Sequence, residues 1–219
     1  MADRGVYIDG SRGEGGGQIL RTALTLSMLT RRPVRLVGIR AGRPKPGLAA
    51  QHLTAVRAAA RCCMARVGGA KLGAVDLLFE PGEMTTGDLE EEIGTAGATS
   101  LVLQTVALPL SLADGPSRVT LTGGTHVPWS PTFDFLDSDW CPAMARLGIR
   151  VGVRLHRSGY YPQGGGRILA LIPGGSHARA QKLQLRGNLQ SLVGKVFTSN
   201  LPEAVGEGIT REARRHLRR

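Results

Sequence analysis

The chain has 219 residues, of which 42% are apolar and only 4% aromatic, and it carries a formal net charge of +11. This length and composition exclude global disorder, because aliphatic side chains and alanine suffice for a sizeable core. The longest mostly apolar segment, residues 101–113, is too short and too interrupted to cross a bilayer, which needs roughly 20 apolar residues. We therefore expect a soluble cytoplasmic protein with no membrane partner, and the positive charge favours a polyanionic partner such as nucleic acid.

The first part of the chain alternates strand and helix signals. A strand-like segment, a glycine-rich loop and an apolar helical segment come first, and strand and helix signals then follow again. The predicted elements are a strand at 6–8, a helix at about 18–29, a strand at 34–39, a helix at about 49–64 and a strand at 75–79. This order predicts a βαβαβ-type unit.

The next part of the chain repeats this order with anchor residues displaced by about 82 positions. Leu20-Arg21-Thr22 corresponds to Leu103-Gln104-Thr105. The predicted elements are a helix at about 100–112, a strand at 118–121, a helix at about 133–147 that Pro142 kinks or starts, and a strand at 167–172 after a hairpin-like turn at 159–166. We expect an α+β fold of repeated βαβαβ-type modules with helices packed on a sheet.

The pattern changes after residue 175. Polar-alternating segments at 182–186 and 191–197 predict strands, and a helix is expected from about residue 202. A fragment of this size cannot close a core of its own, so it is interpreted as the start of a small inserted α/β domain. The predicted boundaries are 1–83 for the first repeat, 84–178 for the second and 179–219 for the incomplete inserted domain.

The sharpest local feature is the glycine-rich loop at residues 13–17, which leads into Gln18 and the first helix. Glycines let backbone amides approach a ligand, and a helix N-terminus offers unpaired N–H groups to a phosphate. Glu14 would repel a phosphate unless a divalent cation lay between them, so Glu14 is a candidate metal ligand. The loop is neither a Walker A motif nor a dinucleotide-binding fingerprint, because the Lys-Ser/Thr pair and the GxGxxG spacing are missing. A plain tight turn remains the alternative.

Two further polar residues occupy equivalent places in the repeats. Arg21 lies one turn into the first helix, on the same face as Gln18. Gln104 lies at the corresponding place in an otherwise apolar helix, where a long polar side chain needs a partner or a cleft. The two side chains could converge where the units meet. A surface role for Arg21 is the alternative.

A cationic loop stiffened by proline and glycine follows the second predicted strand. Arg40, Arg43 and Lys45 lie in this loop, and Gln51 and His52 follow near the start of the next helix. Guanidinium groups match phosphate oxygens in bidentate geometry. The loop is therefore a candidate phosphate site, with a structural hydrogen-bonding role as the alternative for His52.

The loop at residues 123–131 contains Trp129 between Pro128 and Pro131, so it could offer a flat wall to a base. The alternative is a connection that packs under the following helix. Asp134, Asp137 and Asp139 lack calcium-loop spacing and are expected to be helix-start acids. The three cysteines, Cys62, Cys63 and Cys141, show no zinc-site spacing and are expected to be reduced.

These stretches together are more specific than any one of them. IDGSRGEGGGQILRTAL, IRAGRPKPGLAAQHLTAV, LVLQT, GGT with its following prolines, and GYYPQGGG occur in this order along essentially the whole chain. In order and spacing they resemble the RNA 3′-terminal phosphate cyclase family. The resemblance implies a large domain of three repeats, with a small domain inserted before the third, so that this chain holds the first two repeats.

The resemblance also implies a reaction. A histidine attacks the α-phosphate of ATP in the presence of Mg²⁺ or Mn²⁺, AMP passes to an RNA 3′-phosphate, and the neighbouring 2′-hydroxyl displaces it to leave a 2′,3′-cyclic phosphate. Carried over, Glu14 becomes a metal ligand and Pro131 lies against adenine. The implied phosphate or active-site contacts are Gln18, Arg21, Arg40, Arg43, Gln51 and His52, and Gln104 is an implied ATP contact.

The family's nucleophilic histidine belongs to the third repeat, and none of the five histidines here has its sequence context. We therefore expect the chain to be truncated before the nucleophile and unable to form the adenylate unless a second polypeptide supplies the missing repeat. Three alternatives remain: a non-catalytic RNA-binding relative acting in RNA processing, an enolpyruvyl transferase, which shares the repeat architecture, and an inactive gene fragment.

Overall fold

The computed structural model describes residues 5–13, 15–185 and 187–217 of the chain. Two compact units are present, a larger one that extends to Gln181 and a smaller one that begins at Lys182. The larger unit contains two four-stranded sheets. The predicted α+β class is therefore confirmed, whereas the exact repeat boundaries remain predictions.

The first sheet has the strand order β1-β2-β4-β3. Strand β1 runs parallel to β2, and β4 is antiparallel to both of its neighbours. The elements of this repeat are β1 (Val6–Asp9), α1 (Gln18–Thr30), β2 (Val34–Val37), α2 (Ala50–Cys62), β3 (Arg66–Gly68) and β4 (Leu77–Glu80).

The second sheet has the corresponding order β5-β6-β8-β7, with β5 parallel to β6 and the other pairs antiparallel. Its elements are β5 (Gly87–Glu92), α3 (Thr99–Leu112), β6 (Ser117–Gly123), α4 (Phe133–Phe135), η1 (Leu136–Trp140), α5 (Cys141–Arg146), β7 (Gly152–Arg157) and β8 (Gly166–Ile172). The hairpin expected at 159–166 joins β7 to β8.

The repeated module is thus βαβαββ, one strand longer than the predicted βαβαβ. The sequence prediction missed β3 because it has only three residues, Arg66–Gly68. It also missed β5, whose GDLEEE sequence is rich in acids that are normally depleted in strands. In β5 the alternation still holds, because Leu89 and Glu91 face inward and are buried.

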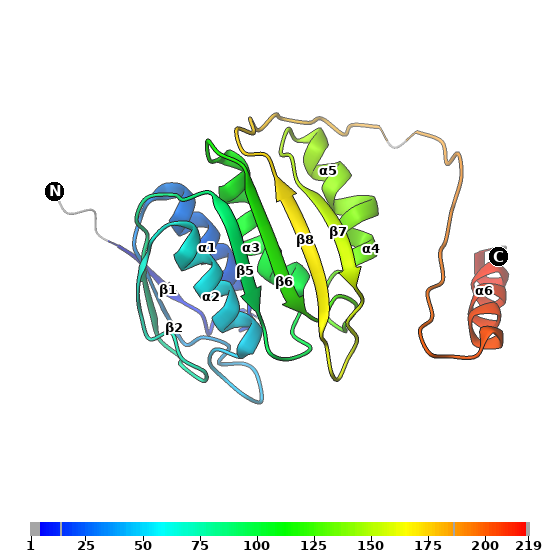
Figure 1. Cartoon of the computed structure of the whole chain (residues 1–219), viewed down its shortest axis with the longest axis horizontal. Coiled ribbons are helices and arrows are strands. Elements are labelled where there is room, and N and C mark those ends of the chain that lie inside the picture. Colours follow the sequence, from blue (N-terminus) through cyan, green and yellow to red (C-terminus); the bar gives the residue numbers. More distant parts are fainter. Residues whose placement is uncertain (1–4, 14, 186, 218–219) are drawn as a thin grey trace. The chain divides into compact units, whose positions relative to one another are not determined.

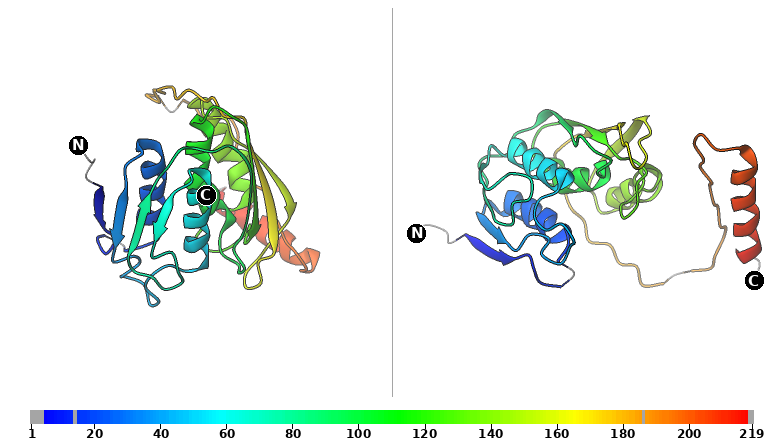
Figure 2. Two further views of the ribbon diagram at one scale, coloured as in Figure 1. Left: turned by 60° about the vertical axis from the view of Figure 1, so that its left-hand side comes forward. Right: turned by 90° about the horizontal axis from the view of Figure 1, so that it is seen from below.

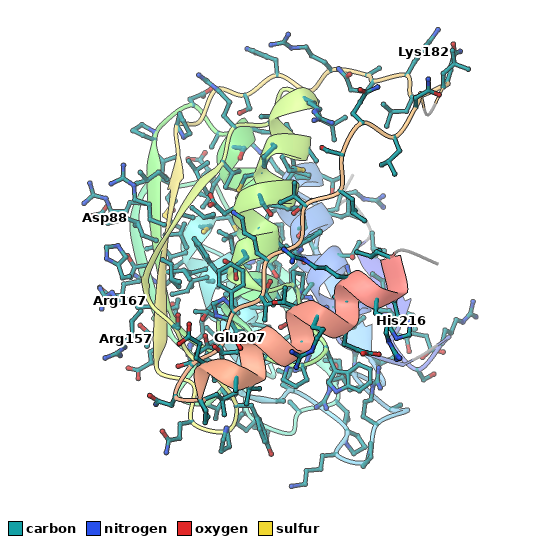
Figure 3. All side chains as sticks on the ribbon, turned by 90° about the vertical axis from the view of Figure 1, so that its right-hand side faces the viewer. Asp88, Arg157, Arg167, Lys182, Glu207 and His216 are labelled. Atoms are coloured by element: carbon teal, nitrogen blue, oxygen red, sulfur yellow. The ribbon has the colours of Figure 1, made fainter. Side chains whose placement is uncertain are left out.

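Helices α1, α2 and α3 lie between the two sheets of the larger unit, whereas α4 and α5 lie beside β7 and β8 (Figures 1 and 2). Helix α1 packs against β2 and β4 of its own sheet, and α3 packs against β6 and β8. Helix α2 contacts α1 and α3 and also reaches β5 of the second repeat. The core between the sheets is aliphatic, as the composition requires, and its fully buried side chains include Leu20, Leu24, Leu36, Leu77, Phe79, Leu103, Leu110 and Leu121. The outer face of the second sheet is polar, and Figure 3 shows Asp88, Arg157 and Arg167 pointing away from it.

The single helix expected at about 133–147 is interrupted by a π-helical turn, η1. Pro142 is the second residue of α5, two residues after the last residue of that turn. Proline has no N–H to donate and its ring crowds the preceding turn, so a wider turn accommodates it. This outcome agrees with the expected kink or start at Pro142.

The smaller unit contains one helix, α6 (Glu203–Leu217), at the place where the sequence predicted it. The strand predictions at 182–185 and 191–197 are wrong, because the structure has neither strand nor helix there. Alternating polar and apolar residues form a strand only when a neighbouring strand pairs with them and a core covers the apolar face, and these residues are exposed. Residue 186 lies outside the described residues.

Two further expectations can be compared with the structure. Cys62, Cys63 and Cys141 are free and buried, as predicted. Burial raises the pKa of the Cys62 thiol to about 12, so this cysteine is an inert packing group. Within the described ranges, no helix is long and apolar enough to cross a membrane.

Candidate anion-binding site

The glycine-rich loop leads into helix α1, whose first turn has no side-chain cap. Gly17 is the N-cap residue of α1 and provides no side-chain cap. Gly15 has a left-handed φ of 56°, and a Cβ there would lie 2.9 Å from the backbone nitrogen of Gly42. Only glycine therefore lets this loop pack so closely on the loop after β2, and the two loops form one wall of the site.

Gly17 also lies directly against two of the predicted site residues. A Cβ on Gly17 would lie 2.1 Å from Nε2 of His52 and 3.0 Å from Nη1 of Arg21. The φ of Gly17 is −76°, which any residue adopts, so glycine is required here by space and not by backbone conformation. The absence of a side chain brings the His52 ring and the Arg21 guanidinium to the first turn of α1.

His52 is a buried histidine without a complete set of hydrogen bonds. Its side chain is 4% exposed, and its Nδ1 has no partner among the described residues. Burial and the nearby charges of Arg40 and Arg21 lower the pKa of His52 to about 4. The ring is therefore neutral at pH 7, and it offers a polar nitrogen in a place where such groups are normally satisfied.

Arg21 is held in place by its neighbours on α1. Its Nη2 donates to Oε1 of Gln18 at 2.9 Å, and Nε2 of Gln18 donates to Oγ1 of Thr22 at 3.0 Å. The Nε of Arg21 is buried and has no partner within the described part of the chain. Burial lowers the pKa of Arg21 from its ordinary value, although the group stays charged at neutral pH.

Arg40 and Arg43 add two more cations from the loop after β2. Arg40 has a left-handed φ of 54°, and its Nη1 donates to the carbonyl of Gly47 at 2.7 Å. Burial, followed by the charge of Arg43, lowers the pKa of Arg40. The guanidinium of Arg43 reaches the glycine loop, because its Nη2 lies 3.0 Å from the Cβ position of Gly16.

The structure thus brings together Arg21, Arg40, Arg43 and His52 at the N-terminus of α1; we call this set the cationic cluster. Like charges in partly buried surroundings disfavour one another unless an anion offsets them. Open helix amides, guanidinium forks and an unsatisfied imidazole nitrogen are the donors that bind phosphate oxygens. The arrangement has the chemistry to bind a phosphorylated ligand.

Gln51 makes a hydrogen bond to the second repeat. Its Oε1 accepts a hydrogen bond at 2.9 Å from the backbone N–H of Ala98, the N-cap residue of α3. Gln51 therefore connects the first repeat to the second and lies beside His52 in the chain. Its predicted role as a ligand contact remains a prediction.

The other predicted contacts lie on the second repeat or outside the described residues. Gln104 is half-buried on α3, and the carbonyl of Pro131 accepts a hydrogen bond from Ser100 on the same helix at 2.8 Å. Glu14, the predicted metal ligand, is not among the described residues. In the ranges that are described, no group of three His, Cys, Asp or Glu side chains gathers to hold a metal ion.

The loop at residues 123–131 is anchored at its base. The Nε2 of His126 lies 2.8 Å from Oδ2 of Asp134, and its ring stacks on Tyr160 at 5.2 Å. The backbone N–H of Thr125 donates to the carbonyl of Gly159. The loop therefore has a fixed base on the β7–β8 hairpin, while Trp129 at its tip is completely exposed.

Sequence reasoning missed two residues that position the site. Gly17 belongs to the predicted loop, but its role as the space for His52 depends on a contact between distant segments. Glu91 is buried and pairs with Arg57 and Arg61 of α2 at 3.2 and 3.1 Å. The sequence shows Glu91 only as one acid among several in β5. Its partners lie 30 and 34 residues away, so the pairing could not be predicted locally.

The fold and the cluster define a class: an α+β repeat protein with a cationic, glycine-lined site at a helix N-terminus. The sequence model of the RNA 3′-terminal phosphate cyclase family matches residues 12–201. A relative named RNA 3′-terminal phosphate cyclase from Methylococcus capsulatus is 51% identical over 94% of this chain and 60% of its own length. One of the same name from Nostoc punctiforme is 46% identical over 97% of this chain and 63% of its own length.

The chain belongs to the RNA 3′-terminal phosphate cyclase family. It spans about 60% of the length of the curated relatives that it matches. The resemblance inferred from the motifs is confirmed.

Proposed function

We propose that this chain supplies the phosphate-binding half of an ATP-dependent RNA 3′-phosphate cyclase. In that role it binds ATP and the 3′-phosphate end of an RNA. The observation that carries the proposal is the cationic cluster, in which Arg21 and His52 lie against Gly17 at the start of α1 and the arginines of the loop after β2 lie close by.

The cluster favours phosphate over other ligands. The side chain of His52 is buried, and one of its ring nitrogens lacks a partner within the described residues. A bound phosphate would offset the mutual repulsion of the arginines, and Nε2 of His52 lies at the helix start where such a phosphate would bind. Free amides at the start of α1 would add hydrogen bonds without any charge of their own.

Each residue then has a role that its surroundings support. Arg21, held by Gln18, would contact a phosphate near the first turn of α1, and Arg40 and Arg43 would contact phosphates from the opposite loop. His52, neutral at pH 7, would act as a hydrogen-bonding group and not as a cation. Positioned charges of this kind stabilise the charge that develops on phosphoryl oxygens during transfer.

The proposal includes Mg²⁺ or Mn²⁺ with ATP. The described members of the cluster offer cations and amides, so a metal would be held by phosphate oxygens and by Glu14, which lies outside the described residues. When bound, the metal would align the leaving pyrophosphate. Gln104 and Pro131 are proposed contacts of the nucleoside of ATP.

His52 is not proposed as the nucleophile. In the reaction that family membership suggests, a histidine nitrogen bonds to the α-phosphorus of ATP and pyrophosphate leaves. His52 is buried with its Nε2 directed at the backbone of Gly17, so it lacks the free approach that in-line attack requires. We therefore expect no covalent AMP on this chain.

The test measures binding and chemistry on the same 219-residue chain. Calorimetry with ATP and Mn²⁺, and anisotropy with an RNA oligonucleotide that ends in a 3′-phosphate, should both show saturable binding that weakens in the Arg21→Gln variant. Arg118→Ala removes an exposed arginine on β6 and is the matched control for loss of charge. A preference for the 3′-phosphate over a 3′-hydroxyl is also expected.

Intact-mass measurement after incubation with ATP and Mn²⁺ completes the test, with a full-length relative as positive control. The proposal predicts that no AMP adduct forms on this chain. An adduct lost in His52→Asn would overturn the role given to His52. If the chain binds neither ATP nor the 3′-phosphorylated RNA, the proposal as a whole is overturned.

A further inference from the structure

A cavity of about 460 Å³ lies between the N-terminus of α3, the loop at residues 123–131 and the β7–β8 hairpin. Its walls include Gln51, Leu101, Pro128, Trp129 and Tyr161. We call this cavity the aromatic slot. None of its lining residues is charged, so the slot suits a flat, neutral group and not a phosphate.

Two aromatic side chains of the slot are exposed to solvent. Trp129 is 100% exposed and Tyr161 is 74% exposed. Large aromatic side chains dominate cores and interfaces because burying them is strongly favourable, so exposure of two at one cavity indicates a partner. The chain has only two tryptophans, and the other, Trp140, is packed against the core.

Trp129 is also held in a conformation that a bulky residue rarely adopts. Its φ is 63°, in the left-handed region. Such strain persists only where the surroundings impose it. Here the surroundings are rigid, because Ser130 donates to the carbonyl of Val127 at 3.0 Å and Ser100 donates to the carbonyl of Pro131 at 2.8 Å. The backbone that carries the indole is therefore fixed, and little backbone entropy remains to be lost on binding.

The slot and the cationic cluster adjoin through helix α2. Gln51 lines the slot, and His52, the next residue, belongs to the cluster. A nucleic acid chain alternates phosphates with bases, so a strand that places its terminal phosphate on the cluster brings a base to the neighbouring slot. The expected adenine contacts of ATP, Pro131 and Gln104, are not among the slot's lining residues. A second base, distinct from the adenine of ATP, can therefore be tested at the slot by measuring RNA binding and ATP binding separately.

We infer that the aromatic slot binds an unpaired base at the 3′ end of the RNA substrate by stacking on Trp129 and Tyr161. Stacking on an aromatic side chain is how proteins hold single-stranded bases with little sequence preference, since every base has a π face. This inference rests on the proposed function, because the same RNA end must place its phosphate on the cationic cluster.

The test compares the affinities of single variants for two ligands. An RNA oligonucleotide with a 3′-phosphate is measured by anisotropy, and ATP with Mn²⁺ by calorimetry. Trp129→Ala should weaken RNA binding about tenfold, the usual scale for loss of one stacked base, and should leave ATP binding unchanged. Trp129→Phe, which keeps a ring, should retain most of the affinity. Tyr7→Ala is the matched control, because Tyr7 is an exposed aromatic on β1.

A second measurement identifies the base. When the last two nucleotides of the oligonucleotide are made abasic, the difference between the wild type and Trp129→Ala should disappear. Quenching of the tryptophan fluorescence by the normal oligonucleotide should likewise be lost in Trp129→Phe.

The possible results are distinguishable. Weaker ATP binding with unchanged RNA binding in Trp129→Ala would assign the slot to adenine and overturn the inference. If both affinities stay unchanged in Trp129→Ala but fall in Arg21→Gln, the inference fails and the proposed function stands. If the wild type binds neither ligand, both fail together.

Discussion

Helix α1 of the first repeat begins behind Gly17 with no side-chain cap, and the cationic cluster surrounds its first turn. Helix α3 of the second repeat begins in closed surroundings. The N–H of Ala98 donates to Gln51, and the N–H of Thr99 donates to the carbonyl of Gly124 at 2.9 Å. The N–H groups of Ala98 and Thr99 are thus bonded inside the protein, whereas no partner is found among the described residues for the N–H groups of Gly17 and Gln18 at the start of α1.

The difference between the repeats lies in their loops and in a few side chains. Arg21 in the first repeat corresponds to Gln104 in the second, a charge replaced by a neutral amide. The loop after β2 adds Arg40 and Arg43 to the first repeat, whereas the loop after β6 carries Trp129. The proposed anion binding thus depends on what surrounds the helix and not on the module itself.

The largest effect on ATP affinity is expected from adding a methyl group at Gly17, at the N-terminus of α1. Gly17→Ala places a Cβ 2.1 Å from His52 and must displace the ring or the helix start. We expect ATP affinity to fall about 100-fold, because shifts of about 1 Å at a positioned site have effects of that order. Calorimetry measures this change. Gly16→Ala is the comparison, since its Cβ meets only the far end of the Arg43 side chain, at 3.0 Å, and should lower the affinity less; equal effects of the two variants would contradict the steric explanation.

Replacing Arg21 with the glutamine that the second repeat has at the corresponding place should lower ATP affinity somewhat less. Arg21→Gln removes a charged donor worth about 2 kcal/mol to a bound phosphate, or roughly 30-fold in ATP affinity. Folding stability should change little, because the charge of Arg21 is already costly in its buried position. The reciprocal Gln104→Arg should create no phosphate site. Enhanced phosphate binding in that variant would show that the residue at this place in the helix decides the difference on its own.

The buried histidine predicts a pH dependence of stability. The folded pKa of His52 is about 4, below the ordinary value of 6.5, so between these values the unfolded chain binds the proton more readily. Stability should therefore fall as the pH decreases through this window, by about 2 kcal/mol between pH 7 and pH 5. Urea unfolding of the wild type and of His52→Asn measures the contribution. Identical pH profiles of the two proteins would show that His52 is charged or exposed in the folded state.

The smallest effect is expected from removing the hydrogen bond between Gln51 and Ala98 at the N-terminus of α3. Gln51→Ala leaves the N–H of Ala98 unsatisfied and should lower the free energy of unfolding by about 1 kcal/mol. Gln51→Glu keeps an acceptor for this N–H and should restore stability, but its charge beside His52 should weaken phosphate binding. Thermal unfolding and calorimetry separate the two effects. If both variants lose stability equally, the hydrogen bond to Ala98 contributes nothing.

The order of elements could be predicted from the sequence because hydrophobic periodicity is local. The helices at 18–30, 50–62 and 99–112 were each located to within about two residues, since long apolar periods end at clear loop signals. Strands β3 and β5 were missed because one is short and the other owes its pairing to β6. The strands predicted at 182–185 and 191–197 were wrong for the opposite reason: alternation was present, but no partner strand was.

The residues of the cationic cluster could be proposed from the sequence, because charged side chains near glycines and a helix start are recognisable locally. Their convergence could not, since it depends on how the loop after β2 packs on the loop after β1. Gln51 shows the limit most clearly. Its proximity to a helix start in a cationic region predicts a ligand contact, which remains a prediction, but its hydrogen bond to the second repeat, 47 residues away, could not be predicted from the local sequence.

Helix α2 belongs to the first repeat but completes the core of the second, since it packs on α3 and reaches β5. Arg57 and Arg61 of this helix pair with the buried Glu91. Either repeat expressed alone would thus leave a large apolar face bare and buried polar groups unmatched. The larger unit should unfold in a single cooperative transition, with urea midpoints that agree between probes placed in the two sheets.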